Sequence, residues 1–250
     1  MPNEKLYNGL AWIWPIMSPP EDYIDEALYF VKLADKYAPK SPRKALNLGC
    51  GGGHVDYTLK KYFDLTGVDQ SEAMLELARK LNPEINYVRG DMRDVRLDNL
   101  FDAVIVHDAI SYMLTEDDLK RVFETAFLHL KPGGIFMAIV EETPDKFRQS
   151  KINYFTHARN GVEITSVEHF YDPDPRDSVY DYVLIYLIKQ NKQLMVEVDN
   201  HTCGIFPLTT WKNLLAEEGF ENHHEEYYQS AEYPNENYTV LVAFKPMAAI

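Results

Sequence analysis

The sequence predicts an α/β fold in which a mostly parallel sheet is covered by helices on both faces. Two observations support it. Apolar strand-like segments alternate with amphipathic helical segments from residue 44 to residue 140, and four glycines crowd positions 49–53, directly after the first apolar segment. Regular strand–helix alternation is typical of parallel sheets. Ligands bind such sheets beyond the carboxyl ends of the strands, where the glycine-rich segment lies.

The expected elements follow in order along the first half of the chain. A helix is predicted to begin with Ser18 as its N-cap, Pro19 in its first turn and Glu21 completing a capping box. The later apolar and amphipathic patterns predict strands and helices by their periods of two and 3.6 residues. The predicted strands are 44–48, 64–69, 85–91, 101–108 and 135–140, and the predicted helices between them are 54–63, 71–81 and 116–130.

The pattern changes after about residue 145. Residues 162–201 are rich in β-branched and aromatic side chains, with turn signals at 172–177 and 189–193. This composition predicts antiparallel strands inserted into the sheet or laid over it. A helix at 209–220 and a final strand at 237–246 complete the predicted domain.

The overall composition narrows the classes of partner. Lysine plus arginine total 25 and aspartate plus glutamate total 39, which gives a formal net charge of −14. This balance argues against a general affinity for nucleic acid or an anionic membrane, and it favours neutral or cationic small molecules. No apolar run is long enough to span a bilayer, and no secretory signal is evident. We expect neither a nucleic-acid nor a membrane partner, and the pattern leaves the oligomeric state open.

Cysteine and histidine usage gives two further expectations. Cys50 lies inside the glycine-rich segment, where a structural disulfide with Cys203 would be unusual, so the sequence predicts a reducing, cytoplasmic compartment. No CxxC or HExxH pattern is present, and no metal site is predicted.

The spacing of the glycines separates two kinds of nucleotide loop. A dinucleotide fingerprint G-x-G-x-x-G that starts at Gly49 needs glycine at position 54, which is His54. The segment instead reads G-x-G-x-G through Gly49, Gly51 and Gly53, as expected for a loop that passes under a ligand without a pyrophosphate. A nicotinamide-dependent oxidoreductase stays open as the alternative.

Five segments in this order, "LNLGCGGG", "LTGVDQS", "RGDMRDV", "FDAVIVHDAISYML" and "LKPGGIF", resemble the motif series of class I S-adenosylmethionine-dependent methyltransferases. The resemblance implies a Rossmann-like three-layer αβα sandwich, with a seven-stranded, mostly parallel sheet and an antiparallel last strand. It also implies S-adenosylmethionine as cofactor and S-adenosylhomocysteine as product. "GDMRD" and the inserted strands resemble small-molecule N-methyltransferases, including enzymes that dimethylate amino sugars.

On this basis we expect a methyltransferase that acts on a small-molecule acceptor, at nitrogen rather than oxygen. Residues 1–250 form one domain with an N-terminal helical cap at 1–40, a cofactor-binding core at 44–140, an inserted β lid and substrate region at 146–207, and a C-terminal part at 208–250. A non-catalytic relative that only binds the cofactor is a second alternative.

The resemblance also implies a cofactor site. Gly49 and Gly51 would pass beneath the amino-acid part, Asp69 would accept from the ribose hydroxyls, and Asp91 would accept from the adenine amino group. Asn47 departs from the pattern, because many relatives carry an acid there. The full expected set is Asn47, Gly49, Cys50, Gly51, Gly53, Asp69, Gln70, Met74, Asp91, Met92, Arg93, His107 and Asp108.

Methyl transfer needs a general base only if the acceptor arrives protonated. The candidate catalytic residues are His107, His201 and Glu141, each of which could equally be a hydrogen-bonded structural group. Tyr7, Trp12 and Trp14 are expected either to cover the active site or to pack in the core, since aromatic faces suit a sulfonium or ammonium group.

Overall fold

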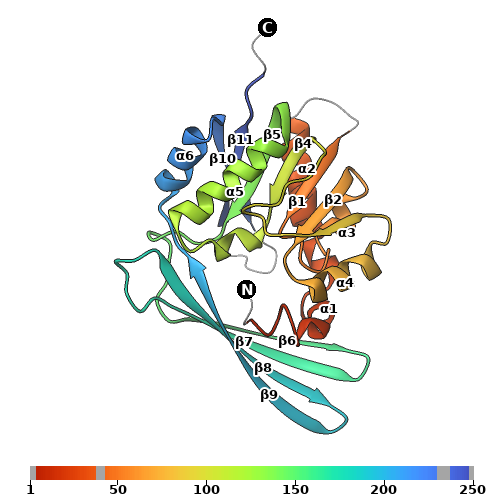
Figure 1. Cartoon of the computed structure of the whole chain (residues 1–250). Helices are drawn as coiled ribbons and strands as arrows, with labels where there is room; N and C mark the ends of the chain where they lie inside the picture. Colours follow the sequence, from red (N-terminus) through yellow and green to blue (C-terminus); the bar gives the residue numbers. More distant parts are fainter. Residues whose placement is uncertain (1–3, 38–42, 230–236, 248–250) are drawn as a thin grey trace.

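The computed structural model describes residues 4–37, 43–229 and 237–247. A seven-stranded sheet has the strand order β10-β11-β5-β4-β1-β2-β3 (Figure 1). The pairs β1–β2, β2–β3, β1–β4 and β4–β5 are parallel, and β11 is antiparallel to both β5 and β10. The predicted fold class, including the antiparallel last strand, is confirmed. The strands are β1 (Lys44–Leu48), β2 (Asp64–Asp69), β3 (Asn86–Arg89), β4 (Phe101–Val106), β5 (Leu130–Val140), β10 (Glu221–Gln229) and β11 (Asn237–Phe244).

Helices cover both faces of this sheet because alternate strand residues point to opposite sides. Ala45 and Ile105 pack with α2 (Ile24–Tyr37), α3 (Asp56–Leu59) and α4 (Glu72–Leu81). Leu46 and Val104 pack on the other face, with α5 (Glu116–His129) and α6 (Leu208–Glu217). Since both faces are buried, the central strands are apolar along their length.

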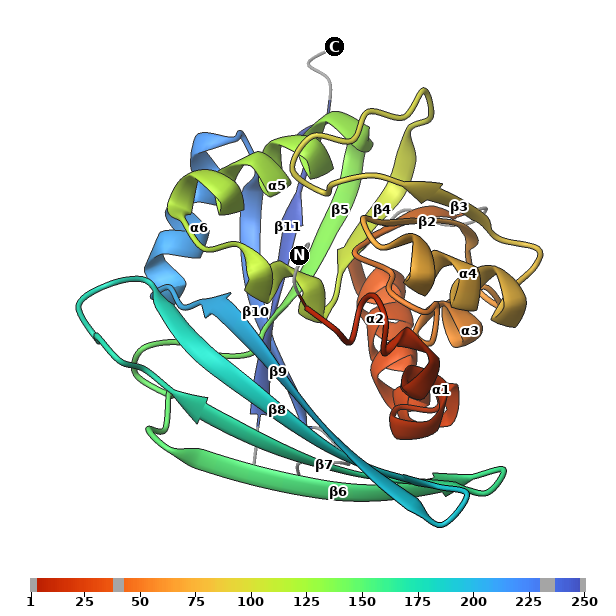
Figure 2. The ribbon, with the colours of Figure 1, turned by 60° about the horizontal axis from the view of Figure 1, so that its bottom comes forward.

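A second sheet contains four antiparallel strands in the order β6-β7-β8-β9. They are β6 (Lys151–Arg159), β7 (Val162–Tyr171), β8 (Val179–Gln190) and β9 (Gln193–Gly204). We call this sheet the lid. Figure 2 shows it extending across one end of the larger sheet, beside the N-terminal segment. Leu6 and Ile13 of that segment, which contains α1 (Trp14–Met17), share an apolar cluster with Ile164, Leu184 and Tyr186 of the lid.

Several predicted element boundaries differ from the structure. Ser18 does not cap the first long helix: it ends α1, a short 3₁₀ turn (Pro20–Tyr23) follows, and α2 begins at Ile24. The physical reason is that Pro20 holds Pro19 in an extended conformation, which interrupts the helical path. The predicted helix 54–63 is helical only over α3, and β6 precedes the first predicted lid strand.

Most of the other predicted boundaries agree more closely, although β5 begins at Leu130 instead of residue 135. Ser71 caps α4, as the sequence predicts, by accepting from the Met74 amide. Among the described helices, none is long and apolar enough to cross a membrane.

Candidate functional site

The glycine loop joins β1 to α3 at the carboxyl edge of the sheet. Gly49, Gly51 and Gly53 have φ of 76°, 52° and 74°, in the left-handed region that favours glycine. A Cβ on Gly49 would lie 2.3 Å from Ala109 Cβ, and a Cβ on Gly53 would lie 2.7 Å from the Tyr87 hydroxyl. Packing therefore excludes side chains at Gly49 and Gly53. At Gly51 there is room for a Cβ, and the left-handed backbone conformation alone favours glycine.

Asp69 ends β2 and binds the loop directly. Its Oδ2 accepts from the Gly51 amide at 2.8 Å, and its Oδ1 accepts from the Ser71 amide at 2.8 Å. Burial raises the pKa of Asp69 above its ordinary value, although these main-chain hydrogen bonds act in the opposite direction. The Ser71 hydroxyl donates to the main-chain carbonyl of Tyr7, so the N-terminal segment is tied down beside this carboxylate.

A buried polar group beneath the loop was missed by the sequence reasoning. Asn47 Nδ2 donates to Asp56 Oδ1 at 2.7 Å, and the Tyr87 hydroxyl donates to Asp56 Oδ2 at 2.9 Å. Burial raises the pKa of Asp56 to about 6. The acid that the family resemblance led us to expect at position 47 thus has a counterpart on α3, in Asp56. An aspartate in the first turn of a helix is so common that its type alone gave no signal.

The residues after β3 form a tight ion-pair cluster. The Arg93 guanidinium donates to both carboxylate oxygens of Asp91, with Nε–Oδ1 at 3.0 Å and Nη2–Oδ2 at 2.6 Å, and to Asp118 at 2.7 Å. Burial alone would raise the pKa of Asp91, but the bonds from Arg93 lower it. Met92 is buried in the core, with its side chain packed beneath Gly49. Its thioether therefore supports the loop in this structure.

The ends of β4 and β5 bring three predicted residues together. His107 Nε2 lies 2.8 Å from Glu26 Oε2, and His107 Nδ1 lies 2.7 Å from Asp108 Oδ1. Burial alone would lower the pKa of His107, but Asp108 and Glu26 raise it well above its ordinary value. The imidazole is therefore held in its charged form, with both ring nitrogens donating to carboxylates.

Glu141 and Asp108 carry opposite pKa shifts. Burial and the neighbouring Asp108 raise the pKa of Glu141 well above its ordinary value. Partial desolvation at the cavity wall would also raise the pKa of Asp108, but His107 and a hydrogen bond with Glu141 lower it overall. The pair thus combines a protonated Glu141 with an ionised Asp108.

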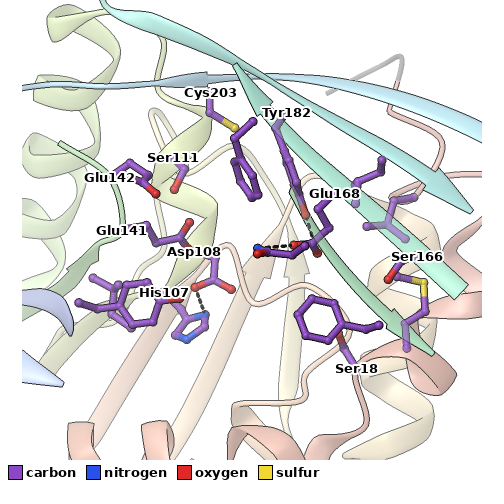
Figure 3. Close-up of a pocket in the computed structure, with 18 of the residues that line it drawn as sticks. Ser18, His107, Asp108, Ser111, Glu141, Glu142, Ser166, Glu168, Tyr182 and Cys203 are labelled. Atoms are coloured by element: carbon purple, nitrogen blue, oxygen red, sulfur yellow. Dashed lines mark hydrogen bonds and ion pairs between the residues drawn. The ribbon is translucent and has the colours of Figure 1, made fainter. Parts of the chain in front are cut away.

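These residues line one wall of a cavity of about 230 Å³ (Figure 3). The N-terminal segment supplies a second wall that includes Tyr7, Trp14 and Glu26. The inner face of the lid supplies the third, which includes Glu168 and Tyr182. The glycine loop is next to this cavity along the sheet edge and does not line it.

Two of the predicted site residues do not line the cavity in this structure. Trp12 is 41% exposed and does not line the cavity. His201 is buried behind Tyr112, whose hydroxyl lies 2.7 Å from His201 Nδ1 and 2.8 Å from the Tyr7 hydroxyl. His201 Nε2 lies 3.1 Å from Asp199 Oδ2. His201 therefore supports Tyr112, and through Tyr112 the Tyr7 hydroxyl, from behind.

The remaining predicted residues have clear positions. The main-chain carbonyl of Gln70 accepts from Arg89 Nε at 3.1 Å, and Met74 is buried with its methyl group facing Gly51. Cys50 is a buried free thiol. Trp14 stacks on His54 with ring centroids 5.9 Å apart. Within the described ranges, no group of three or more side chains is arranged to hold a metal ion.

Comparison with known proteins agrees with this architecture. Residues 45–134 match the family described as "Methyltransferase domain". A relative from Streptomyces venezuelae, dTDP-3-amino-3,4,6-trideoxy-alpha-D-glucopyranose N,N-dimethyltransferase, is 30% identical over 151 residues, which is 60% of this chain. The match covers 63% of that relative, so the chain spans less than two thirds of its length.

Solved structures show the same fold over most of the chain. DesVI from Streptomyces venezuelae superposes with a TM-score of 0.79 at 23% identity, covering 91% of this chain and 92% of DesVI. The S-adenosylmethionine-bound amino pentose methyltransferase CalS10 from Micromonospora echinaspora superposes with a TM-score of 0.76 at 21% identity, covering 89% of this chain and 91% of CalS10. Residues 45–134 are therefore similar to a methyltransferase domain, and the chain shares the overall fold of these solved structures.

Proposed function

We propose that this chain transfers a methyl group from S-adenosylmethionine to a nitrogen atom of a small-molecule acceptor bound in the cavity. The observation that carries the proposal is the position of the cavity: His107, Asp108 and Glu141 line it at the strand ends, beside the glycine loop. Ligands of parallel sheets bind along this edge. An acceptor in the cavity would therefore face a nucleoside held by the loop.

The residues at the loop fit this cofactor. A Cβ on Gly51 would meet only Met74 Cε, at 3.6 Å, so the loop offers bare main chain with room above it. The carboxylate of Asp69 is suited to accept from two ribose hydroxyls. When bound, S-adenosylmethionine supplies an electrophilic methyl group on a cationic sulfur. Gln70, Met74, Asp91 and Met92 remain the proposed contacts of the adenosine part.

We propose that the Asp108 carboxylate binds the amine of the acceptor. Its side chain is 51% exposed and faces the cavity, and His107 keeps it ionised (Figure 3). By accepting one N–H, this carboxylate would direct the nitrogen lone pair toward the methyl group. Transfer would form a nitrogen–carbon bond as the carbon–sulfur bond of the cofactor breaks, and the proton of the nitrogen would pass to the Asp108 carboxylate and from there to solvent. Placing the reactants in line and excluding water supply much of the rate of such a displacement.

His107 is a positioning residue in this proposal. Both of its ring nitrogens lie within hydrogen-bond distance of carboxylates, so it has no free lone pair to accept a proton. Glu141, protonated and hydrogen-bonded to Asp108, is a second positioning residue. Both residues were candidate bases by residue type, but their contacts with carboxylates favour the neighbouring Asp108 as the group that contacts the amine.

The other expectations bear on partners and compartment. The formal net charge of −14 supports a small molecule over nucleic acid as acceptor. Cys50 and Cys203 are both buried free thiols, which supports the proposed cytoplasmic location. The nicotinamide-dependent alternative is not favoured, because residues 45–134 match a methyltransferase domain.

Turnover tests the proposal directly. The full chain is incubated with S-adenosylmethionine and a panel of primary and secondary amines, and S-adenosylhomocysteine is measured by mass spectrometry. We expect product above the acceptor-free background with at least one amine. Binding of NADH without binding of S-adenosylmethionine would contradict the proposal. Cofactor binding without turnover of any amine would instead favour the non-catalytic alternative.

A further inference from the structure

The charge of the cavity limits which acceptors can enter it. Carboxylates line all three walls, whereas Lys151 is the only lysine or arginine among the described residues that line it. Even with Glu141 neutral and His107 charged, negative side chains outnumber positive ones. The lining carboxylates are Asp22, Glu26, Asp108, Glu141, Glu142 and Glu168.

The lid fixes one of these carboxylates opposite the strand ends. Glu168 accepts from the Tyr182 hydroxyl at 3.0 Å and from Asn153 Nδ2 at 3.3 Å (Figure 3). The single lysine is turned toward an aromatic ring: Lys151 Nζ lies 5.2 Å from the centroid of Phe170. Proteins that bind a diphosphate use arginine forks, several lysines or a helix N-terminus, and the described residues that line this cavity offer none of these sets.

A buried hydroxyl gives an independent indication of the ligand. Ser166 lies on the inner face of the lid, is 3% exposed and lines the cavity (Figure 3). A serine hydroxyl at this position of the cavity lining can donate to, or accept from, a hydroxyl of a bound polar molecule. Phe170 and Tyr182 stack beside it, with ring centroids 4.5 Å apart, and offer faces that suit C–H groups or an ammonium group.

We propose, on the basis of the methyltransferase function above, that the acceptor is a phosphate-free hydroxylated amine, neutral or cationic. The cavity selects against an amino sugar that is linked to a nucleoside diphosphate, because the carboxylates on its three walls repel the phosphates. This preference separates the chain from its amino-sugar relative, which is named for a dTDP-linked sugar. The acceptor class then resembles a free or glycosidically linked amino sugar.

Two matched probes test this charge selection. The methyl glycoside of 3-amino-3-deoxyglucose and the thymidine diphosphate conjugate of the same sugar are titrated into the full chain saturated with S-adenosylhomocysteine, by calorimetry. We expect the methyl glycoside to bind at least tenfold more tightly. Equal affinity, tighter binding of the conjugate, or binding of neither probe would overturn the inference.

A pair of variants on β7 shows whether the cavity charge is responsible. Glu168→Gln removes a lining charge and keeps an oxygen for the Tyr182 hydroxyl, whereas Glu163→Gln removes an exposed charge that is paired with Lys189. We expect Glu168→Gln to narrow the preference between the probes at least threefold, and Glu163→Gln to leave it unchanged. An unchanged preference in a Glu168→Gln protein that still binds S-adenosylhomocysteine would contradict the role of the carboxylates.

The cofactor titration separates this inference from the proposed function. If the wild-type chain does not bind S-adenosylhomocysteine, the methyltransferase function itself fails. If it binds S-adenosylhomocysteine and prefers the diphosphate conjugate, the function stands and only the acceptor class is wrong.

Discussion

Asp108 Oδ1 lies 2.7 Å from Nδ1 of His107, and this pair forms the wall of the cavity that faces the lid. The imidazolium is held from its other side by Glu26, so the pair has a fixed orientation. An ionised carboxylate that is half exposed to a cavity and anchored by a buried cation is suited to hold an amine. The first two predictions depend on this geometry.

Asp108→Asn is expected to lower kcat about 100-fold, in the range typical of a positioned group that handles a substrate proton. The asparagine keeps the size of the side chain but loses the charge that accepts the N–H. Initial rates of S-adenosylhomocysteine formation measure the change. Asp117→Asn, an exposed position on α5, is the matched control. Wild-type kcat in a folded Asp108→Asn protein would remove Asp108 from the mechanism.

His107→Gln is expected to shift the pH dependence of kcat as well as lower it. The imidazolium lowers the pKa of Asp108, so its removal should raise that pKa and move the acidic limb of the profile to higher pH. A purely structural role would lower activity equally at all pH values. Profiles of kcat against pH, measured from about pH 5 to about pH 9, distinguish the two cases. Circular dichroism must show that both proteins are folded over this range. A lowered profile of unchanged shape would count against positioning.

Asp69→Ala is expected to abolish most of the thermal stabilisation by S-adenosylmethionine and S-adenosylhomocysteine. A ligand at 100 times its Kd stabilises the native state by about 2.7 kcal/mol, and this gain disappears when affinity is lost. Asp64→Ala, at the exposed start of the same strand, should keep the shift. NADH should stabilise neither protein. A full shift in Asp69→Ala would remove the ribose assignment.

The sequence predicted the architecture, and it predicted that the cofactor binds at the carboxyl edge of the sheet. Both predictions depend on the local pattern of apolar residues and glycines. The apolar strands, Ser71 as a helix cap and the left-handed glycines at 49, 51 and 53 all follow from short-range periods and backbone preferences. These features do not require knowledge of which segments meet in space.

The residues around the proposed acceptor cavity could not be predicted from local pattern. Glu26 and His107 are 81 positions apart in the sequence, and Tyr112 and His201 are 89 apart, so their contacts appear only when the lid and the N-terminal segment close over the strand ends. His201 and Trp12 were plausible by residue type, but burial removes the first from the cavity and exposure removes the second.

One missed feature did have a local signal. Asn160 and Gly161 join β6 to β7 with φ of 51° and 78°, as the two central positions of a type I′ turn require. Asn-Gly between strand-like segments is a strong hairpin signal, and applying it would have added β6 to the predicted lid.

Gly49→Ala and Gly161→Ala form a matched pair, because both glycines have positive φ. A methyl group at Gly161 meets nothing within 4 Å, so only the backbone penalty of about 1–2 kcal/mol applies. At Gly49 the methyl group also collides with Ala109 Cβ, which should bring the loss above about 3 kcal/mol. Urea unfolding measures both. Equal losses would show that Ala109 moves aside and that the loop tolerates a side chain.

His54 is expected to make folding stability dependent on pH in the acidic range. Burial lowers the pKa of His54 from 6.5 to about 4, and the ring stacks on Trp14 at the edge of the loop. The unfolded chain therefore binds a proton that the folded chain does not. The contribution of His54 is fully present above about pH 6.5 and is lost as the pH falls through about 4, amounting to about 3 kcal/mol.

Comparison with His54→Gln isolates this contribution. Asp56 has a pKa raised to about 6 by burial, so its own contribution decreases as the pH rises from 3.8 to about 6, which opposes the effect of His54 in the whole protein. Urea unfolding of the wild type and of His54→Gln at pH 7 and pH 4.5 gives the difference between the two proteins at each pH. That difference should shrink at pH 4.5, by roughly 2–3 kcal/mol. A constant difference would mean that His54 accepts its proton in the folded state as readily as in the unfolded chain.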